Sequence, residues 1–158
     1  MDNTSLMELF PVDDTGLLFV APDIIDWLPL AQQKVRLVID LDAEIDGGVP
    51  TIPNSLMYVY FPVEDGEFLP DLVKLHALGR LAAEMMRHGR AVVVHCAMGF
   101  NRSALVAGVA LTHQGLSGAE ALRQVQERRS GALYNKVYAE YLLSLPPYPE
   151  LSTDHANA

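Results

Sequence analysis

A cysteine, an arginine and a serine lie close together where the pattern of the chain changes from strand to helix. The stretch reads His95-Cys96-Ala97-Met98-Gly99-Phe100-Asn101-Arg102-Ser103. Three valines at 92–94 precede it and predict a buried strand, and the small, apolar run 104–111 predicts a buried helix. A tight loop between a strand and a helix N-terminus gathers backbone N–H groups and the positive end of the helix dipole around one point. Such a point is suited to bind an anion.

Cys96 and Arg102 lie at the two ends of this loop. Backbone amides and a guanidinium match the oxygens of a phosphate, and the same positive field favours the thiolate of a cysteine. Cys96 would then be a nucleophile aimed at a bound phosphoryl group, and the Ser103 hydroxyl would stabilise the departing thiolate. Taken singly, the same residues have plainer interpretations: Cys96 as a small buried hydrophobe, His95 as a core histidine and Arg102 as a solvated helix residue.

The motif His95-Cys96-x5-Arg102-Ser103 resembles the His-Cys-x5-Arg-Ser/Thr signature of the cysteine-dependent protein phosphatases, in particular their short dual-specificity branch. The resemblance implies a two-step hydrolysis through a phosphocysteine, with no metal and no other cofactor. It implies that Cys96 is the nucleophile, that Arg102 binds the phosphate and the transition state, and that Ser103 assists departure of the thiolate. It also implies that His95 supports the loop beneath Cys96. The remaining loop residues would bind the phosphate: Ala97, Met98, Gly99, Phe100 and Asn101.

The reaction also requires an acid, because an ester oxygen departs poorly unless it is protonated. The candidates before the long helix are Glu64, Asp65, Glu67 and Asp71. The family carries its acid after a Pro-Val/Ile-x segment like that at 62–64, at about this distance before the cysteine. The resemblance therefore favours Asp65 as the general acid. The plainer interpretation of 64–66 is a solvated turn.

A second, weaker resemblance covers residues 128–135, Arg-Arg-Ser-Gly-Ala-Leu-Tyr-Asn. It is similar to the Arg-rich, Asn-containing segment of dual-specificity enzymes and implies that Asn135 bonds to the phosphate loop from behind. Arg128 and Arg129 suit the negative end of the preceding helix. We interpret them as solvated helix-end residues, with binding of a second anionic group as the alternative.

Strand and helix patterns alternate along the chain, which predicts a single α/β domain with a central, mostly parallel sheet flanked by helices. Strands are predicted at 16–20, 35–39, 56–61 and 92–95, and helices at 24–30, 69–88, 104–114, 117–129 and 133–145. The resemblance implies the compact dual-specificity phosphatase fold over 1–149, and 150–158 is predicted to be a disordered tail. Cys96 then lies at the carboxyl end of a strand, where parallel sheets bind ligands.

Composition narrows the choice of partners and compartment. Half of the 158 residues are hydrophobic and the net charge is −9, which argues against nucleic acid or an anionic membrane as a partner. The chain has no apolar run long enough to span a membrane, no signal-peptide pattern at its start and one cysteine. We expect a cytoplasmic protein that acts on a phosphorylated protein or a small phosphomonoester, with phosphate or sulfate binding in the loop.

Two alternative functions stay open. Gly99-Phe100-Asn101-Arg102 resembles the loop of the RNA 5′-triphosphatases of the same superfamily, which typically lack the Asp acid. The other alternative is a phosphate-binding interaction module without turnover, which would be expected to have lost Cys96 or Asp65.

The loop carries no lysine, which argues against highly phosphorylated inositides as substrates. The low-molecular-weight tyrosine phosphatases are excluded, because their cysteine loop precedes the acid.

Overall fold

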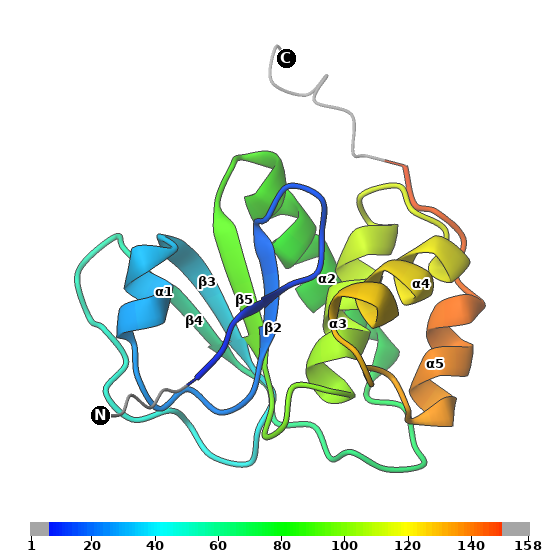
Figure 1. Cartoon of the computed structure of the whole chain (residues 1–158), viewed down its shortest axis with the longest axis horizontal. Helices are drawn as coiled ribbons and strands as arrows, with labels where there is room; N and C mark the ends of the chain where they lie inside the picture. Colours follow the sequence, from blue (N-terminus) through cyan, green and yellow to red (C-terminus); the bar gives the residue numbers. More distant parts are fainter. Residues whose placement is uncertain (1–6, 150–158) are drawn as a thin grey trace.

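A five-stranded sheet forms the centre of the domain in the computed structural model, which describes residues 7–149 (Figure 1). The strand order is β1-β2-β5-β3-β4; β1 pairs antiparallel with β2, and the other neighbours are parallel. The mostly parallel α/β fold predicted from the sequence is thus confirmed. The strands are β1 Phe10–Pro11, β2 Leu18–Ala21, β3 Val35–Asp40, β4 Met57–Tyr60 and β5 Ala91–His95.

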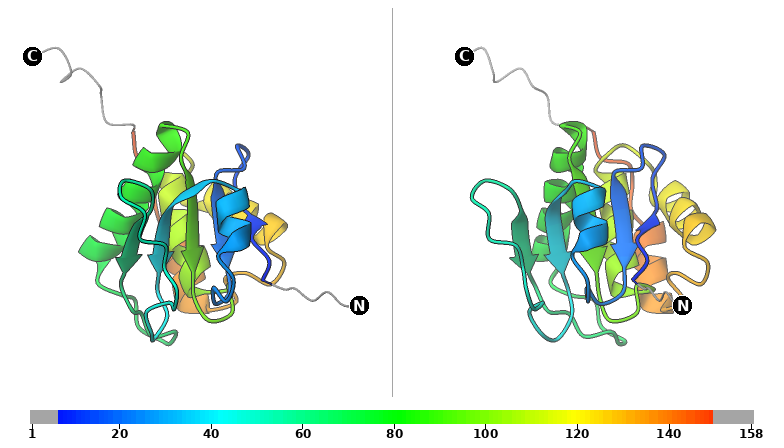
Figure 2. Two further views of the ribbon diagram at one scale, coloured as in Figure 1. Left: turned by 90° about the vertical axis from the view of Figure 1, so that its left-hand side faces the viewer. Right: turned by 60° about the vertical axis from the view of Figure 1, so that its left-hand side comes forward.

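Five helices cover the two faces of the sheet within the described residues. They are α1 Leu28–Gln32, α2 Leu72–Arg87, α3 Arg102–Thr112, α4 Gly118–Arg128 and α5 Lys136–Leu143. Figure 2 shows α1 on one face and the four longer helices on the other. Across residues 7–149, no helix has the length and apolarity needed to cross a membrane.

The alternation of side chains along β5 explains why the sheet has a core on each face. Val92 and Val94 pack in the larger core with α2–α5, whereas Ala91 and Val93 pack in the smaller core, which contains Leu30 of α1. Successive side chains of a strand point to opposite faces. β5 lies between β2 and β3 and is buried on both faces, so packing on both sides fixes its position in the sheet. The end of β5 therefore fixes where the loop that follows His95 begins.

Helix ends depart from the sequence prediction where side chains cap the backbone. The bounds predicted for the first helix, 24–30, are wrong: α1 spans Leu28–Gln32, with a proline in its first turn, and the Asp26 carboxylate accepts a hydrogen bond from the Leu28 N–H. Similarly, α2 begins at Leu72 rather than 69, because the Asp71 carboxylate accepts from the Lys74 N–H. Capping side chains satisfy N–H groups that the helix leaves free and so fix where it starts.

One further helix start and one strand differ from the prediction, and one predicted helix cap is confirmed. The last helix starts at Lys136, not 133, because the Asn135 side chain accepts from the N–H groups of residues 137 and 138. The short antiparallel strand β1 was not predicted, since two residues carry no periodicity. The capping box of Ser117 and Glu120 at the start of α4 is confirmed. The predicted disordered tail at 150–158 lies outside the described residues.

Candidate active site

The loop formed by residues 96–102 joins the end of β5 to the start of α3 and surrounds the sulfur of Cys96. Cys96 is 2% exposed; its Sγ accepts a hydrogen bond from the Gly99 N–H at 3.2 Å and lies 3.3 Å from Ser103 Oγ. Gly99 has a φ of +74°, and a Cβ atom there would lie 2.9 Å from the carbonyl carbon of Ala21. A side chain at 99 would therefore be both strained and crowded. The N–H and the hydroxyl can stabilise a negative charge on sulfur.

Arg129, just past the end of α4, holds this loop from outside. Its Nε donates to Gly99 O and its Nη2 to Met98 O, each at 3.1 Å. The guanidinium lies over the rings of Phe10 and Phe100, 3.9 Å from each centroid, and burial lowers the pKa of Arg129. A carbonyl and the following N–H of a trans peptide point in opposite directions. By holding the Met98 carbonyl, Arg129 thus helps to turn the following N–H, that of Gly99, toward the sulfur.

Our expectation of a solvated arginine at this helix end is wrong for Arg129, whereas Arg128 is exposed. Arg129 is partly buried against the loop, and Arg128 donates to Asp13 O at 3.0 Å and pairs with Asp14. The sequence signal that could have indicated this was a pair of arginines placed before the turn at 130–131, with Phe10 and Phe100 available to stack on a planar cation. Neither phenylalanine is near Arg129 in the sequence, so only the fold brings them together.

Arg102, the first residue of α3, is held by one of its nitrogens and leaves another free. Its Nη1 donates to Val63 O at 2.9 Å and to Leu41 O at 3.4 Å, and lies 3.7 Å from an oxygen of Asp42. Its Nε is buried and has no hydrogen-bond partner among the described residues. A buried donor without a partner is costly, so the site is prepared to receive an acceptor at this nitrogen.

Asp42 belongs to a pair of carboxyl groups beside Arg102. A hydrogen bond from Asp23 is the main reason that the pKa of Asp42 is lowered, and Arg102 lowers it further. Loss of hydration and the same hydrogen bond raise the pKa of Asp23 to about 6. The backbone N–H of Asp23 donates to Ala97 O at 3.3 Å, which places the pair against the 96–102 loop.

Asp65 is the one candidate acid that the structure ties to the loop. Its two carboxylate oxygens accept from Asn101 Nδ2 at 3.0 Å and from Asn135 Nδ2 at 2.8 Å. Asp71 instead caps α2, and no hydrogen bond joins the side chain of Glu64 or Glu67 to the loop within the described part of the chain. Asp65 stands between two hollows of about 480 and 500 Å³, and Arg102 lines the first of them.

Asn135 contacts the loop through its backbone. Its N–H donates to Asn101 Oδ1 at 2.9 Å. The side-chain amide reaches forward to Asp65 and to Gly66 O, while its oxygen caps α5. Asn101 and Asn135 together position Asp65, a role that sequence reasoning did not find.

His95 lies fully buried beneath the loop, in a network of acids. Its Nε2 is 2.6 Å from an Asp46 oxygen and 3.4 Å from an Asp40 oxygen, and the Tyr58 hydroxyl donates to Asp40. Burial raises the pKa of Asp46. Asp40, Asp46 and His95 are residue types that can ligate a metal, and their ligand atoms lie within 4.8 Å of one another. A hydrogen bond joins His95 to Asp46, and the Tyr58 hydroxyl links the Asp46 N–H to Asp40. We therefore interpret the network as the support of the strand end that precedes Cys96.

Comparison with known proteins defines the class to which this fold and site belong. The model of the dual specificity phosphatase catalytic domain matches residues 18–145, and the chain belongs to that family. The chain is therefore a phosphatase of the dual-specificity type. A search of curated proteins gave no match.

Solved structures share the fold over most of the chain. Human DUSP28 is 28% identical with a TM-score of 0.69, covering 85% of this chain and 89% of its own. A mouse protein described as a dual specificity phosphatase, crystallised with zinc tungstate, is 22% identical with a TM-score of 0.73, covering 90% and 88%. The human tyrosine phosphatase-like serine/threonine/tyrosine-interacting protein is 20% identical with a TM-score of 0.68, covering 85% and 92%. The latter two show the fold alone.

Proposed function

We propose that this phosphatase hydrolyses phosphotyrosine, phosphoserine or phosphothreonine in proteins through a phosphocysteine on Cys96. The observation that carries the proposal is the buried Nε of Arg102, which has no partner among the described residues, beside a loop in which the Gly99 N–H donates to the Cys96 sulfur. A phosphoryl group would accept from that nitrogen and present its phosphorus to the sulfur.

The first step would transfer the phosphoryl group to the enzyme. The sulfur of Cys96 attacks phosphorus, an S–P bond forms, and the bond between phosphorus and the ester oxygen breaks. Asp65 gives its proton to the departing oxygen, and Arg102 and the loop N–H groups stabilise the charge on the equatorial oxygens.

The second step would release inorganic phosphate. The Asp65 carboxylate takes a proton from a water molecule, whose oxygen attacks phosphorus as the S–P bond breaks. The electron pair returns to sulfur, where Ser103 and the Gly99 N–H stabilise the thiolate. The enzyme regains its starting state, with Asp65 protonated and Cys96 ionised.

The rim of the site supports a protein substrate over the alternatives. Met98 and Tyr134 are 64% and 69% exposed and give the rim an apolar character. The loop has no lysine for extra phosphates, and the net charge of −9 disfavours RNA. The tyrosine phosphatase-like interacting protein shares the fold, so a binding module is the second candidate, but this chain retains Cys96, Arg102 and Asp65.

The test compares substrates and replaces the nucleophile. The purified protein is assayed on matched phosphotyrosine and phosphoserine peptides, 5′-triphosphate RNA and inositol phosphates. Cys96→Ser is expected to lower kcat by at least about 10³-fold while retaining binding of phosphate or tungstate by calorimetry. A phosphorylated peptide containing Cys96 should be found by mass spectrometry after rapid acid quenching. Turnover by Cys96→Ser, or a preference for RNA, would overturn the proposal.

A further inference from the structure

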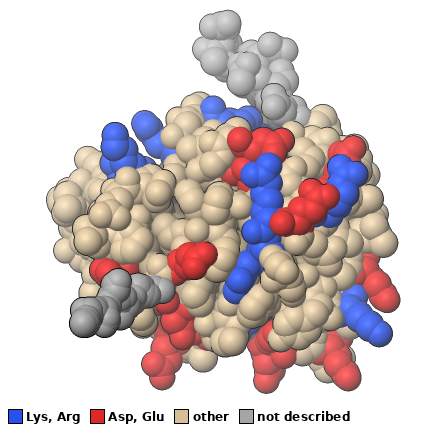
Figure 3. All heavy atoms as spheres, viewed as in Figure 1, with Lys and Arg blue, Asp and Glu red and all other residues tan. Residues whose placement is uncertain are grey.

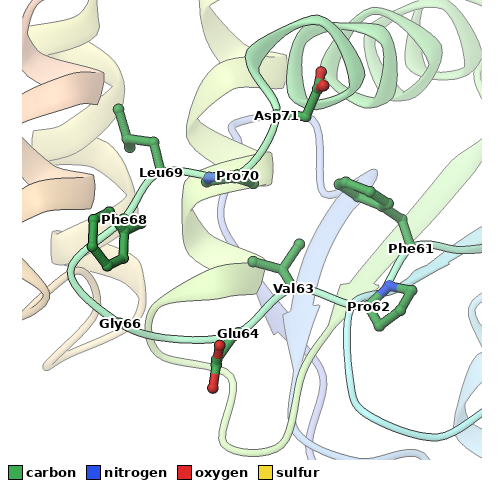
Figure 4. A pocket seen from close by; sticks show the side chains of 9 residues that line it. All are labelled: Phe61, Pro62, Val63, Glu64, Gly66, Phe68, Leu69, Pro70 and Asp71. Atoms are coloured by element: carbon green, nitrogen blue, oxygen red, sulfur yellow. The ribbon is translucent and has the colours of Figure 1, made fainter.

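A pocket of about 260 Å³ lies between the active site and the start of α2. It is formed by the 61–71 segment alone, which makes a wide turn from Phe61 through Gly66 and back to Asp71 (Figure 4). Its lining is mostly apolar, and nothing in the proposed mechanism uses it. The lining residues are Phe61, Pro62, Val63, Glu64, Gly66, Phe68, Leu69, Pro70 and Asp71.

Hydrogen bonds to backbone carbonyls in the pocket wall connect the pocket to the residues of the candidate active site. Val63 O accepts from Arg102 Nη1 at 2.9 Å, Glu64 O accepts from the Tyr138 hydroxyl at 3.0 Å, and Gly66 O accepts from Asn135 Nδ2 at 2.9 Å. These bonds hold the near wall of the pocket in register with Arg102 and Asp65. A ligand bound at both places would therefore meet a prepared surface.

The pocket is also continuous with the site along the surface. Pro62, Val63 and Glu64 line both this pocket and the neighbouring hollow that contains Asp65 and Arg102. A chain whose phosphate reaches Arg102 would thus pass over 62–64 with its next side chains. The neighbours of the phosphorylated residue are the groups in reach of the pocket.

The chemistry of the pocket selects an apolar side chain with a cation beside it. Phe68 is 84% exposed, so covering its ring would remove a large apolar area from water. Glu64 and Asp71 supply two exposed carboxylates, and no lysine or arginine lines the pocket among the described residues. Arg102 contacts the pocket wall only from the active-site side, at Val63 O, and Lys74 lies over the Phe61 ring, 5.7 Å from its centroid. Acidic side chains also gather along the edge at which the parallel strands end (Figure 3).

We propose that the 61–71 pocket binds an apolar residue of the phosphoprotein substrate, next to a Lys or Arg that pairs with Glu64. The inference rests on the proposed function and names its substrate class: phosphorylated segments with a hydrophobic and a basic residue on one side of the phosphorylated residue. Apolar burial would supply affinity, and the carboxylates would reject acidic neighbours.

The test uses phosphopeptides that differ only beside the phosphorylated residue. A Leu-Arg pair is compared with Ala-Glu, placed either before or after that residue. In one of the two placements we expect KM to be about tenfold lower for Leu-Arg, with little change in kcat. Equal KM values in both placements would overturn the inference.

Two variants and a control assign the preference to the pocket. Phe68→Ala should remove most of the preference for Leu, and Glu64→Gln most of the preference for Arg. Val73→Ala removes a side chain that is 77% exposed on α2 and lines neither hollow, so it should leave all KM values unchanged. If Phe68→Ala behaves like Val73→Ala, the pocket does not contact the substrate.

The two proposals fail in distinguishable ways. Cys96-dependent hydrolysis of para-nitrophenyl phosphate, without any peptide preference, would overturn the docking inference and leave the proposed activity standing. If no substrate is hydrolysed, binding of the same peptides to the Cys96→Ser protein is measured by fluorescence anisotropy. There, Leu-Arg should bind about tenfold more tightly than Ala-Glu, and equal affinities would overturn the inference.

Discussion

Asn101 connects the phosphate-binding and acid parts of the site through one buried amide. It is 3% exposed, and although it immediately precedes α3, its side chain does not cap that helix. The amide nitrogen donates to Asp65 and the amide oxygen accepts from the Asn135 N–H. Both polar atoms of a buried amide are thus satisfied, and their geometry fixes where Asp65 can be.

Replacement of Asp65 by Asn should separate leaving groups by their need for a proton. An amide cannot protonate the ester oxygen, so we expect kcat for a phosphotyrosine peptide to fall by about 10²- to 10⁴-fold. For para-nitrophenyl phosphate, whose leaving group is stable as an anion, the fall should be several times smaller. Steady-state kinetics on both substrates measures the difference.

The control is Glu67→Gln, a neighbouring carboxylate with no hydrogen bond to the loop in the described structure. It should leave both rates close to those of the unchanged protein. Equal losses on the two substrates for Asp65→Asn would mean that Asp65 orients the site without donating the proton. A large loss for Glu67→Gln would move the acid to that residue.

At the scale of elements, the 96–102 loop depends on contacts with α4 and β1 as well as on its own sequence. Arg129 follows α4, Phe10 belongs to β1, and Phe100 lies in the loop. The two carbonyls that Arg129 holds are those of Met98 and Gly99. A layer of helices on one side of the sheet therefore helps to orient the loop that follows β5.

Removing the donors of Arg129 should disturb this orientation. Arg129→Met keeps an apolar side chain between the two phenylalanines but donates no hydrogen bonds to the loop. We expect kcat/KM to fall by about tenfold or more, because small displacements of positioned groups weaken catalysis strongly. The affinity of Cys96→Ser for tungstate, measured with and without Arg129→Met, should fall in parallel, which shows that the loop itself has changed.

Arg123→Met, within the preceding helix α4, provides the matched control. Arg123 is exposed, and its charged group lies 3.9 Å from Glu127, a pair that contributes little at the surface. Its kcat/KM should stay within about twofold of the unchanged protein. If Arg129→Met has no larger effect than this control, Arg129 does not orient the loop.

At the scale of the whole molecule, a cluster of aromatic and histidine side chains ties the helical layer together. His76 of α2 is 2.9 Å from His113, which follows α3, and 2.6 Å from the hydroxyl of Tyr141 in α5. Tyr148 stacks on His113 with ring centroids 4.4 Å apart. Burial lowers the pKa of both histidines, that of His113 to about 4 with a further contribution from His76.

This cluster predicts that the fold loses stability as the solution becomes acidic. The unfolded chain binds protons at these histidines near pH 6.5, whereas the folded protein binds one at His113 only near pH 4. The contribution of neutral His113 to stability is therefore fully present above about pH 6.5 and is lost as the pH falls toward 4. From His113, the free energy of unfolding should decrease by on the order of 1 to 2 kcal/mol between pH 7 and pH 5.

Urea unfolding at the two pH values measures this change. His113→Gln should reduce the pH dependence by that amount. The same slope for the variant and the unchanged protein would show that His113 does not account for the loss.

The sequence by itself determined the features that depend on residues close together in the chain. The valines of β5, the loop with Gly99 and the apolar run of α3 place Cys96 and Arg102 at a strand end and a helix start, because side-chain periodicity and steric limits act over a few residues. The capping box at Ser117 was readable for the same reason.

Only the tertiary structure decided which distant groups meet. Asn101 and Asn135 hold Asp65 from 36 and 70 positions away, Asp46 reaches His95 across 49, and Arg129 reaches Gly99 across 30. These contacts follow from the order β2-β5-β3-β4 and from the packing of α4 and α5 beside the loop. No periodicity encodes them, since a hydrogen bond between remote side chains forms only when the whole core sets their separation.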